Sequence, residues 1–159
     1  MTLETANTLS PETPEDTSVP VSALWLGGTG ALPFVGCAVL AVFGTQDWQG
    51  LGTQALVAYG AVILSFLGGV HWGLAIGRGP SSNVSGSHLI LSVVPSLVGW
   101  AALLLPVGAD LLPLALAFAA MFIVDLRLTQ NGPLPAWYPK LRLPLTIVVI
   151  TSLLVGAAG

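Results

Sequence analysis

Residues 53–77 read TQALVAYGAVILSFLGGVHWGLAIG, an uninterrupted run that contains no Asp, Glu, Lys or Arg. A helix needs roughly 20 mainly apolar residues to cross the hydrocarbon core of a bilayer, which is about 30 Å thick. Lipid offers no partners for backbone N–H and C=O groups, so a single segment crosses it only as an α-helix, which pairs these groups internally. The run therefore predicts a transmembrane helix over residues 53–77.

Four further apolar runs flank this segment, and polar or Gly- and Pro-rich loops separate them. Together the five runs predict an all-α fold, a polytopic transmembrane helix bundle of about five spans within residues 21–159. Asp110 stands directly before the fourth run, where an N-cap is expected. The expected spans are residues 21–43, 53–77, 88–105, 111–128 and 142–159.

The N-terminal segment, residues 1–20, has a different composition. It holds four acidic residues and three prolines, and it has no Lys or Arg. This composition predicts a disordered acidic tail. A secretory signal begins with basic residues, and a mitochondrial presequence is rich in Arg and poor in acids, so neither description fits. We therefore expect a bacterial protein of the inner membrane.

The overall composition excludes several classes of protein. Apolar residues make up 54% of the chain and charged residues only 7%, whereas about a quarter of a soluble domain is charged. With four acidic residues in the tail, the remaining chain has too few charges to cover a water-exposed surface. This excludes a soluble enzyme domain, a nucleic-acid binder and a disordered protein.

The single cysteine, Cys37, has no intramolecular disulfide partner.

The basic residues predict how the chain is threaded. Five spans would bring Arg78, Arg127, Lys140 and Arg142 to the same side of the membrane as the N-terminus. Cytoplasmic loops carry an excess of Lys and Arg, so we expect the N-terminus in the cytoplasm and the C-terminus in the periplasm. The same four side chains are candidate ligands for lipid phosphates.

Small residues recur at every fourth position of the second run. A helix places such residues on one face, and close backbone approach is a main source of helix association in lipid. This ridge has two alternative uses: packing inside the protein's own bundle, or docking onto a partner or a second copy. Its members are Ala61, Ser65, Gly69, Gly73 and Gly77.

Ionisable residues inside or beside the spans form a candidate polar cluster, because the threading brings them to one membrane side. Its members are His71, Arg78, His88, Asp125 and Arg127. A buried carboxylate needs a cation or must stay protonated, so Asp125 is expected to pair with one of the arginines or with protonated His71. The cluster can be a staple between helix ends or a proton relay through His71 and Asp125. No ligand spacing predicts a metal site, and no motif predicts a cofactor.

Several segments together resemble a family of small multi-pass membrane proteins of unknown function that includes vertebrate transmembrane protein 69. The resemblance covers roughly residues 21–155 and is closest to bacterial members. It implies a multi-pass membrane protein but no reaction, ligand or catalytic residue. The segments that carry it are LGGTGALPFVGCA (26–38), YGAVILSFLGGVHWGLA (59–75), SVVPSLVGWAALLLP (92–106) and PAWYPKLRLPLT (135–146).

Three functions compete on these grounds. The leading one is a non-enzymatic membrane protein that acts through helix contacts as an accessory or assembly component, with the bilayer and a membrane protein or a second copy as partners. The alternative is a small oligomeric transporter or proton-linked permease that uses Asp125 and His71, with Pro33 and Pro95 inside their helices. The third is an enzyme that holds lipid head groups with its basic residues, although no nucleophile stands beside a general base.

Overall fold

The computed structural model describes residues 18–77, 86–106, 108–131 and 134–159. Within these ranges the secondary structure is entirely helical, which confirms the predicted all-α fold. Four of the helices are long and apolar enough to cross a membrane, and the third helix is shorter. The helices are α1 (Val21–Phe43), α2 (Gln46–Gly77), α3 (Gly86–Ala102), α4 (Leu111–Gln130) and α5 (Tyr138–Ala158).

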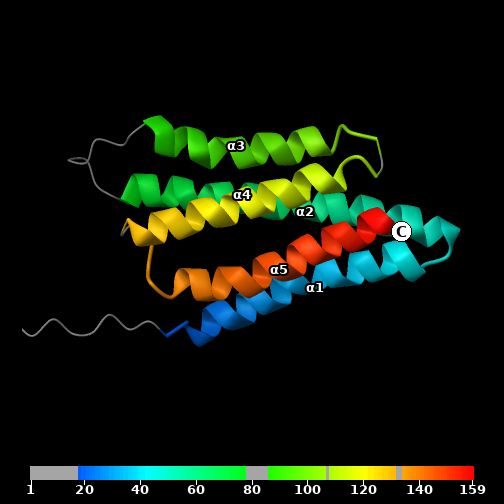
Figure 1. The fold of residues 1–159 in the computed structure, drawn as a ribbon, viewed down its shortest axis with the longest axis horizontal. Helices are drawn as coiled ribbons and strands as arrows, with labels where there is room; N and C mark the ends of the chain where they lie inside the picture. The colour runs from blue at the N-terminus through cyan, green and yellow to red at the C-terminus, as the bar shows by residue number, and fades with distance from the viewer. Residues whose placement is uncertain (1–17, 78–85, 107, 132–133) are drawn as a thin grey trace, which may run out of the picture.

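The five helices lie side by side along the long axis of the molecule, and successive helices run in opposite directions (Figure 1). The start of α1 and the C-terminus therefore lie at opposite ends of the bundle (Figure 1). Helices α1 and α5 begin, and α4 terminates, at the same end of the bundle (Figure 1). We call it the Tyr138 end. The second helix is in contact with each of the other four, so the segment that predicts the fold is also the centre of the bundle.

The second helix begins at Gln46 and not at residue 53, so the predicted loop over residues 44–52 is reduced to Gly44 and Thr45. Gly52 is the last residue of that predicted loop. A Cβ atom at Gly52 would lie within 3.0 Å of the backbone of Ala41 in α1. The glycine thus serves close helix packing, in which small residues let two backbones approach.

The fifth helix begins at Tyr138 and not at residue 142. Pro139 stands in its first turn, where the missing N–H costs no hydrogen bond, and Pro144 lies inside the helix. Both bounds of α3 and the end of α4 differ by two or three residues from the expected spans: α3 covers residues 86–102, and α4 extends to Gln130. Such shifts are ordinary at frayed helix ends.

Asp110 precedes α4 as expected, but its side chain makes no capping bond to that helix. Its carboxylate accepts a hydrogen bond from the backbone N–H of Gly108 at 3.1 Å. Gly108 has a φ of 94°, a conformation that glycine adopts readily. Asp110 therefore stabilises the turn before α4 and not the first turn of α4 itself, and the predicted capping role is wrong.

The core lies between α1, α2, α4 and α5. Phe34 of α1 is its aromatic centre, in edge contact with Tyr59 of α2 and Phe118 of α4 at centroid distances of 4.9 and 5.9 Å. Such edge-to-face pairs are favourable beyond the area they bury. Tyr59 also donates a hydrogen bond from its hydroxyl to the carbonyl of Gly30 at 2.8 Å, so the phenol is satisfied in an apolar setting.

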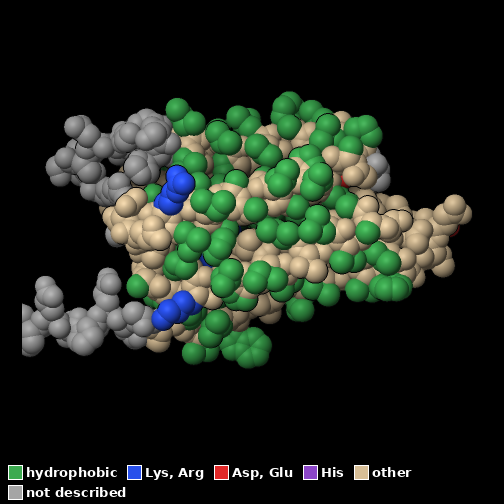
Figure 2. All heavy atoms as spheres, viewed as in Figure 1, with side chains coloured by type: hydrophobic (Ala, Val, Ile, Leu, Met, Phe, Trp, Pro, Cys, Tyr) green, Lys and Arg blue, Asp and Glu red, His purple; other side chains and the backbone are tan. Residues whose placement is uncertain are grey.

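The outer surface of the helices is apolar. Large hydrophobic side chains such as Trp25, Leu26 and Phe66 are 65–74% exposed. Figure 2 shows hydrophobic side chains along the length of the visible face, whereas the visible Lys and Arg side chains lie near the Tyr138 end. A contiguous apolar surface of this extent marks contact with lipid or another protein, which agrees with a multi-pass membrane protein.

Candidate functional site

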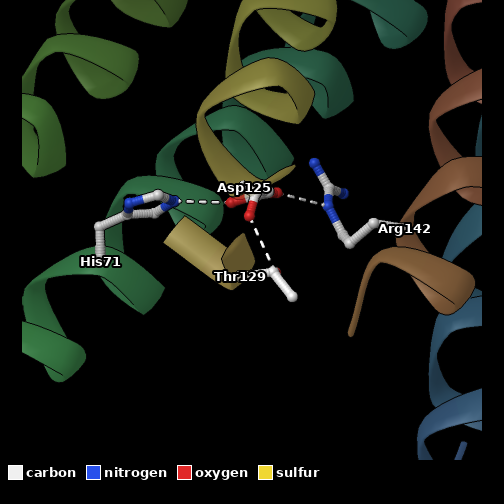
Figure 3. Close-up of polar contacts among 4 residues, drawn as sticks. All are labelled: His71, Asp125, Thr129 and Arg142. Atoms are coloured by element: carbon white, nitrogen blue, oxygen red, sulfur yellow. Dashed lines mark hydrogen bonds and ion pairs between the residues drawn. The ribbon is translucent and has the colours of Figure 1, made fainter. Parts of the chain in front are cut away.

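Asp125 of α4 is the centre of a buried polar site that joins three helices (Figure 3). Its Oδ1 lies 2.9 Å from Nε2 of His71 in α2, and its Oδ2 accepts a hydrogen bond from Nε of Arg142 in α5 at 2.9 Å. The side chains of His71, Asp125 and Arg142 are 4%, 1% and 8% exposed. We call these three residues the Asp125 triad.

The triad lies near the Tyr138 end but inside the helices. His71 and Asp125 stand six and five residues before the ends of α2 and α4, and Arg142 stands four residues after the start of α5. At 1.5 Å per residue, the three side chains lie about 6–9 Å inside the helix ends. The site therefore lies within the helical bundle and not in the loops at this end.

The hydrogen-bond pattern assigns a role to each group. Arginine stays protonated in proteins, and an ionised carboxylate only accepts hydrogen bonds. Nε2 of His71 therefore carries the hydrogen that points to Asp125, an assignment made from the pattern of partners. Asp125 and Arg142 balance each other's charge, which a buried carboxylate requires.

Three polar atoms in and beside the triad are buried without a hydrogen-bond partner: Nδ1 of His71, Nη2 of Arg142 and Oγ1 of Thr146. Thr129, in contrast, donates to the backbone carbonyl of Asp125 at 3.0 Å, as threonine commonly does inside helices. Buried polar groups are nearly always paired, so these three atoms have hydrogen-bonding capacity that the described residues do not use.

The structure brings together only part of the predicted polar cluster. His71 and Asp125 are in contact, as the common membrane side of their helices led us to expect. Arg127 is exposed on α4 and does not pair with Asp125. Arg78 lies outside the described residues, and so does the side chain of His88, although its backbone belongs to the first turn of α3.

Arg142 corrects two predictions. It is the arginine that pairs with Asp125, where Arg78, Arg127 or protonated His71 was expected as the partner. It is also 93% buried, so it is not a surface ligand for lipid phosphates, as Lys140 and Arg127 still can be from their exposed positions. The predicted set of four lipid-phosphate ligands is therefore wrong at Arg142.

The register of α5 held the signal that would have found Arg142. Tyr138, Arg142 and Thr146 recur every four residues and so share one helix face, and this face continues through the buried Val149 and Leu153. The expected span began at residue 142, so it left out Tyr138 and placed Arg142 at the very end of the helix. An earlier start, supported by Pro139, predicts Arg142 on the inner face.

The small-residue ridge divides into two parts. Ala61 is buried against Gly99 of α3, and Ser65 is half-buried with its hydroxyl bonded to the carbonyl of Ala61 at 2.9 Å. Gly69, Gly73 and Gly77 are exposed, and among the described residues a Cβ atom built on any of them meets nothing within 4 Å. Packing inside the bundle is therefore the wrong interpretation for these three glycines, which we call the outer glycines.

Comparison with known proteins places this architecture in a family. Two curated relatives are both named transmembrane protein 69. The protein from Xenopus tropicalis is 39% identical over 138 residues, which cover 84% of this chain and 53% of the relative. The protein from Mus musculus is 28% identical over 136 residues, which cover 86% of this chain and 55% of the relative. The chain thus spans about half the length of these relatives. No solved structure matches it. The model of the family described as protein of unknown function (DUF3429) matches residues 19–158, so the chain belongs to this family of transmembrane proteins.

Proposed function

We propose that this protein is a non-enzymatic accessory or assembly component of a membrane complex, and that the outer face of α2 is its contact surface. The outer glycines carry the proposal. They follow one another at every fourth position, they are exposed, and nothing in the described part of the chain approaches them. Helices associate in lipid where small residues let backbones approach.

The neighbours of the outer glycines support the same face. Phe66 and Ile76 lie three residues before Gly69 and three residues after Gly73, and they are 65% and 66% exposed. Residues three or four apart are neighbours on a helix surface. The face thus combines small residues, which admit another backbone, with large apolar side chains that would pack beside it.

We also propose the bacterial inner membrane as the location, with the Tyr138 end in the cytoplasm. Arg127 and Lys140 are exposed near this end, and basic residues favour the cytoplasmic side. The buried Arg142 contributes less to this bias than the sequence indicated, because its charge is paired with Asp125. The N-terminus would then be cytoplasmic and the C-terminus periplasmic.

A double substitution, Gly69→Leu with Gly73→Leu, tests the proposed contact surface. Neither leucine meets a neighbour at its Cβ, so the bundle should fold, whereas a docked helix would be pushed away. The matched control is Gly28→Leu with Gly36→Leu on α1, where an added Cβ also meets nothing within 4 Å. The readout is particle mass after extraction into native-lipid nanodiscs.

We expect the wild type and the α1 control to share a mass above that of one chain, and the α2 variant to have the mass of a single chain. A wild type with the mass of one chain, or an α2 variant with the wild-type mass, would contradict the proposal. Mass spectrometry of the larger particle then distinguishes a second copy from another membrane protein.

A proton-linked permease is the second candidate, and one observation favours it. Nδ1 of His71 is buried without a partner while Nε2 faces the carboxylate of Asp125, and a histidine in this position can exchange a proton. One observation opposes it: Oδ2 of Asp125 already accepts a hydrogen bond from Nε of Arg142. Proton flux into proteoliposomes that is lost in Asp125→Asn and His71→Ala, but kept in Arg127→Ala, would favour this candidate over the first.

A further inference from the structure

A cavity of about 320 Å³ runs between α1, α2 and α5. It extends along α1 from Ala23 to Phe34 and along α5 from Tyr138 to Val149, which at 1.5 Å per residue is about 16 Å in each case. Its volume is at the lower end of the range of about 300–1,000 Å³ typical of ligand pockets. The cavity is therefore elongated along the bundle axis and of ligand size.

The cavity wall is apolar apart from one end. Aliphatic and aromatic side chains and glycines form most of it, and Tyr138 and Arg142 are its polar residues. Arg142 has one orphaned donor, Nη2, which is buried without a partner. The triad uses Nε of Arg142, which is bonded to Asp125 (Figure 3), and Nη2 has no partner.

Charge balance limits which chemical groups can accept a hydrogen bond from Nη2 of Arg142. Asp125 already compensates the charge of Arg142, and a second anion beside the pair would be buried without a counter-charge, which is costly. An uncharged carbonyl oxygen accepts a hydrogen bond without adding charge. The chemistry of the site thus favours a neutral carbonyl at the end of an apolar chain.

The cavity is also accessible from the hydrocarbon. Leu26 of α1 and Phe66 of α2 line it and are 74% and 65% exposed on the lipid-facing surface. Arg142 lies about 6 Å inside the start of α5, near the boundary between hydrocarbon and interface. In diacyl phospholipids the ester carbonyls lie at this boundary and the acyl chains extend from it along the membrane normal.

We infer that the cavity between α1, α2 and α5 binds one acyl chain of a membrane phospholipid, whose ester carbonyl accepts a hydrogen bond from Nη2 of Arg142 once a small rotation of the guanidinium turns this buried donor into the cavity. The elongated apolar space accommodates the acyl chain, and the hydrogen bond from Nη2 of Arg142 sets how far along the cavity the ester carbonyl lies. A chain that enters between Leu26 and Phe66 follows the bundle axis as its neighbours in the bilayer do. Phe66 also belongs to the proposed contact face of α2, so a docked partner would cover this entrance. The test below substitutes residues of α1 alone and does not require that partner.

Gly30→Leu tests the cavity directly. Gly30 lines the cavity, and a Cβ atom there meets nothing within 4 Å, so the leucine side chain would occupy the space of the lipid chain. Gly36→Leu is the matched control, because Gly36 also has free space at its Cβ and is not part of the cavity wall. Ala31→Leu, at a second position in the wall, is an independent variant.

The measurement is native mass spectrometry after transfer from phosphatidylcholine nanodiscs into detergent, with retained lipid counted per chain. We expect about one retained phospholipid for the wild type and Gly36→Leu, and at least a fivefold loss for Gly30→Leu and Ala31→Leu. No retained lipid on the wild type, or equal retention in all four proteins, would overturn the inference. Far-UV circular dichroism checks that each variant is folded, and the two cavity variants must agree.

Replacing the lipid tests the carbonyl. Nanodiscs made from ether-linked phosphatidylcholine offer the same head group and chains without the ester carbonyls. We expect several-fold weaker retention of the ether lipid by the wild type. Equal retention of the ester and ether lipids would contradict the hydrogen bond from Arg142 and so overturn the inference as stated.

Discussion

The carboxylate of Asp125 and the guanidinium of Arg142 meet at 2.9 Å across two helices, with 1% and 8% of their side chains exposed. The two residues are 17 positions apart, and the connection between α4 and α5 brings them together at the Tyr138 end. His71 adds α2 to the same carboxylate. One acidic side chain thus ties three of the five helices together.

Removing one member of this ion pair is expected to destabilise the bundle more than removing both. Arg142→Leu or Asp125→Leu leaves an uncompensated buried charge, and such changes cost about 3–5 kcal/mol. The double variant Asp125→Leu with Arg142→Leu leaves no charge in this pair and should lose less. The free energy of unfolding, measured by steric trapping in bicelles, checks this. Losses in the double variant that equal the sum of the two single losses would contradict the pairing.

His71 should act as a donor to Asp125 and not as packing alone. His71→Leu removes the hydrogen bond and is expected to cost about 1.5–3 kcal/mol, the usual value for a bond to a charged group. His71→Gln keeps an N–H donor and should lose clearly less. Equal losses of unfolding free energy in the two variants, measured in the same bicelles, would show that the bond contributes nothing.

The adjacent glycines Gly68 and Gly69 are expected to respond in opposite ways to alanine. A Cβ atom at Gly68 would collide with the carbonyl of Ser92 in α3, whereas a Cβ atom at Gly69 meets nothing within 4 Å. Gly68→Ala should therefore cost about 1–3 kcal/mol by overpacking. Gly69→Ala should be neutral or stabilising, because alanine favours a helix by about 1 kcal/mol over glycine.

The measurement for this pair is the thermal midpoint in one detergent, with wild type as the reference. The predicted order is Gly68→Ala below the wild type and Gly69→Ala at or above it. A fall in the midpoint of Gly69→Ala as large as that of Gly68→Ala would mean that the outer glycines pack inside the bundle after all.

Cysteine labelling from the outside of intact cells tests the proposed orientation. In a Cys37→Ser background, Lys140→Cys should be protected from a membrane-impermeant maleimide, and Gly159→Cys should react. The reason is that the basic Tyr138 end is expected in the cytoplasm. Reaction at position 140 with protection at position 159 would reverse the orientation.

Much of the fold could be predicted from the sequence, because the bilayer imposes one simple requirement on each run. The helical state of α2 followed from its length and apolar character. Its start at Gln46 did not, because Gly52 is compatible with a turn and with close packing, and only the position of Ala41 in α1 decides between them.

The candidate site was predictable in part. His71 and Asp125 were placed on one membrane side by threading alone, and the structure joins them. The choice of Arg142 over Arg127 depends on the rotation of two helices about their axes, which a count of spans does not contain. The rotation of α2 about its own axis likewise decides that Gly68 faces α3 while Gly69 faces outward.

Photo-crosslinking from the outer face of α2 is the most direct test of the central claim that this face binds a protein. Benzoylphenylalanine at Ile76, beside Gly73 and 66% exposed, is compared in native membranes with the same residue at Ile147 on α5, which is 56% exposed. The account predicts one adduct of defined mass from position 76, none from position 147, and loss of the adduct in Gly69→Leu with Gly73→Leu. No adduct from position 76, or the same adduct from both positions, would contradict it.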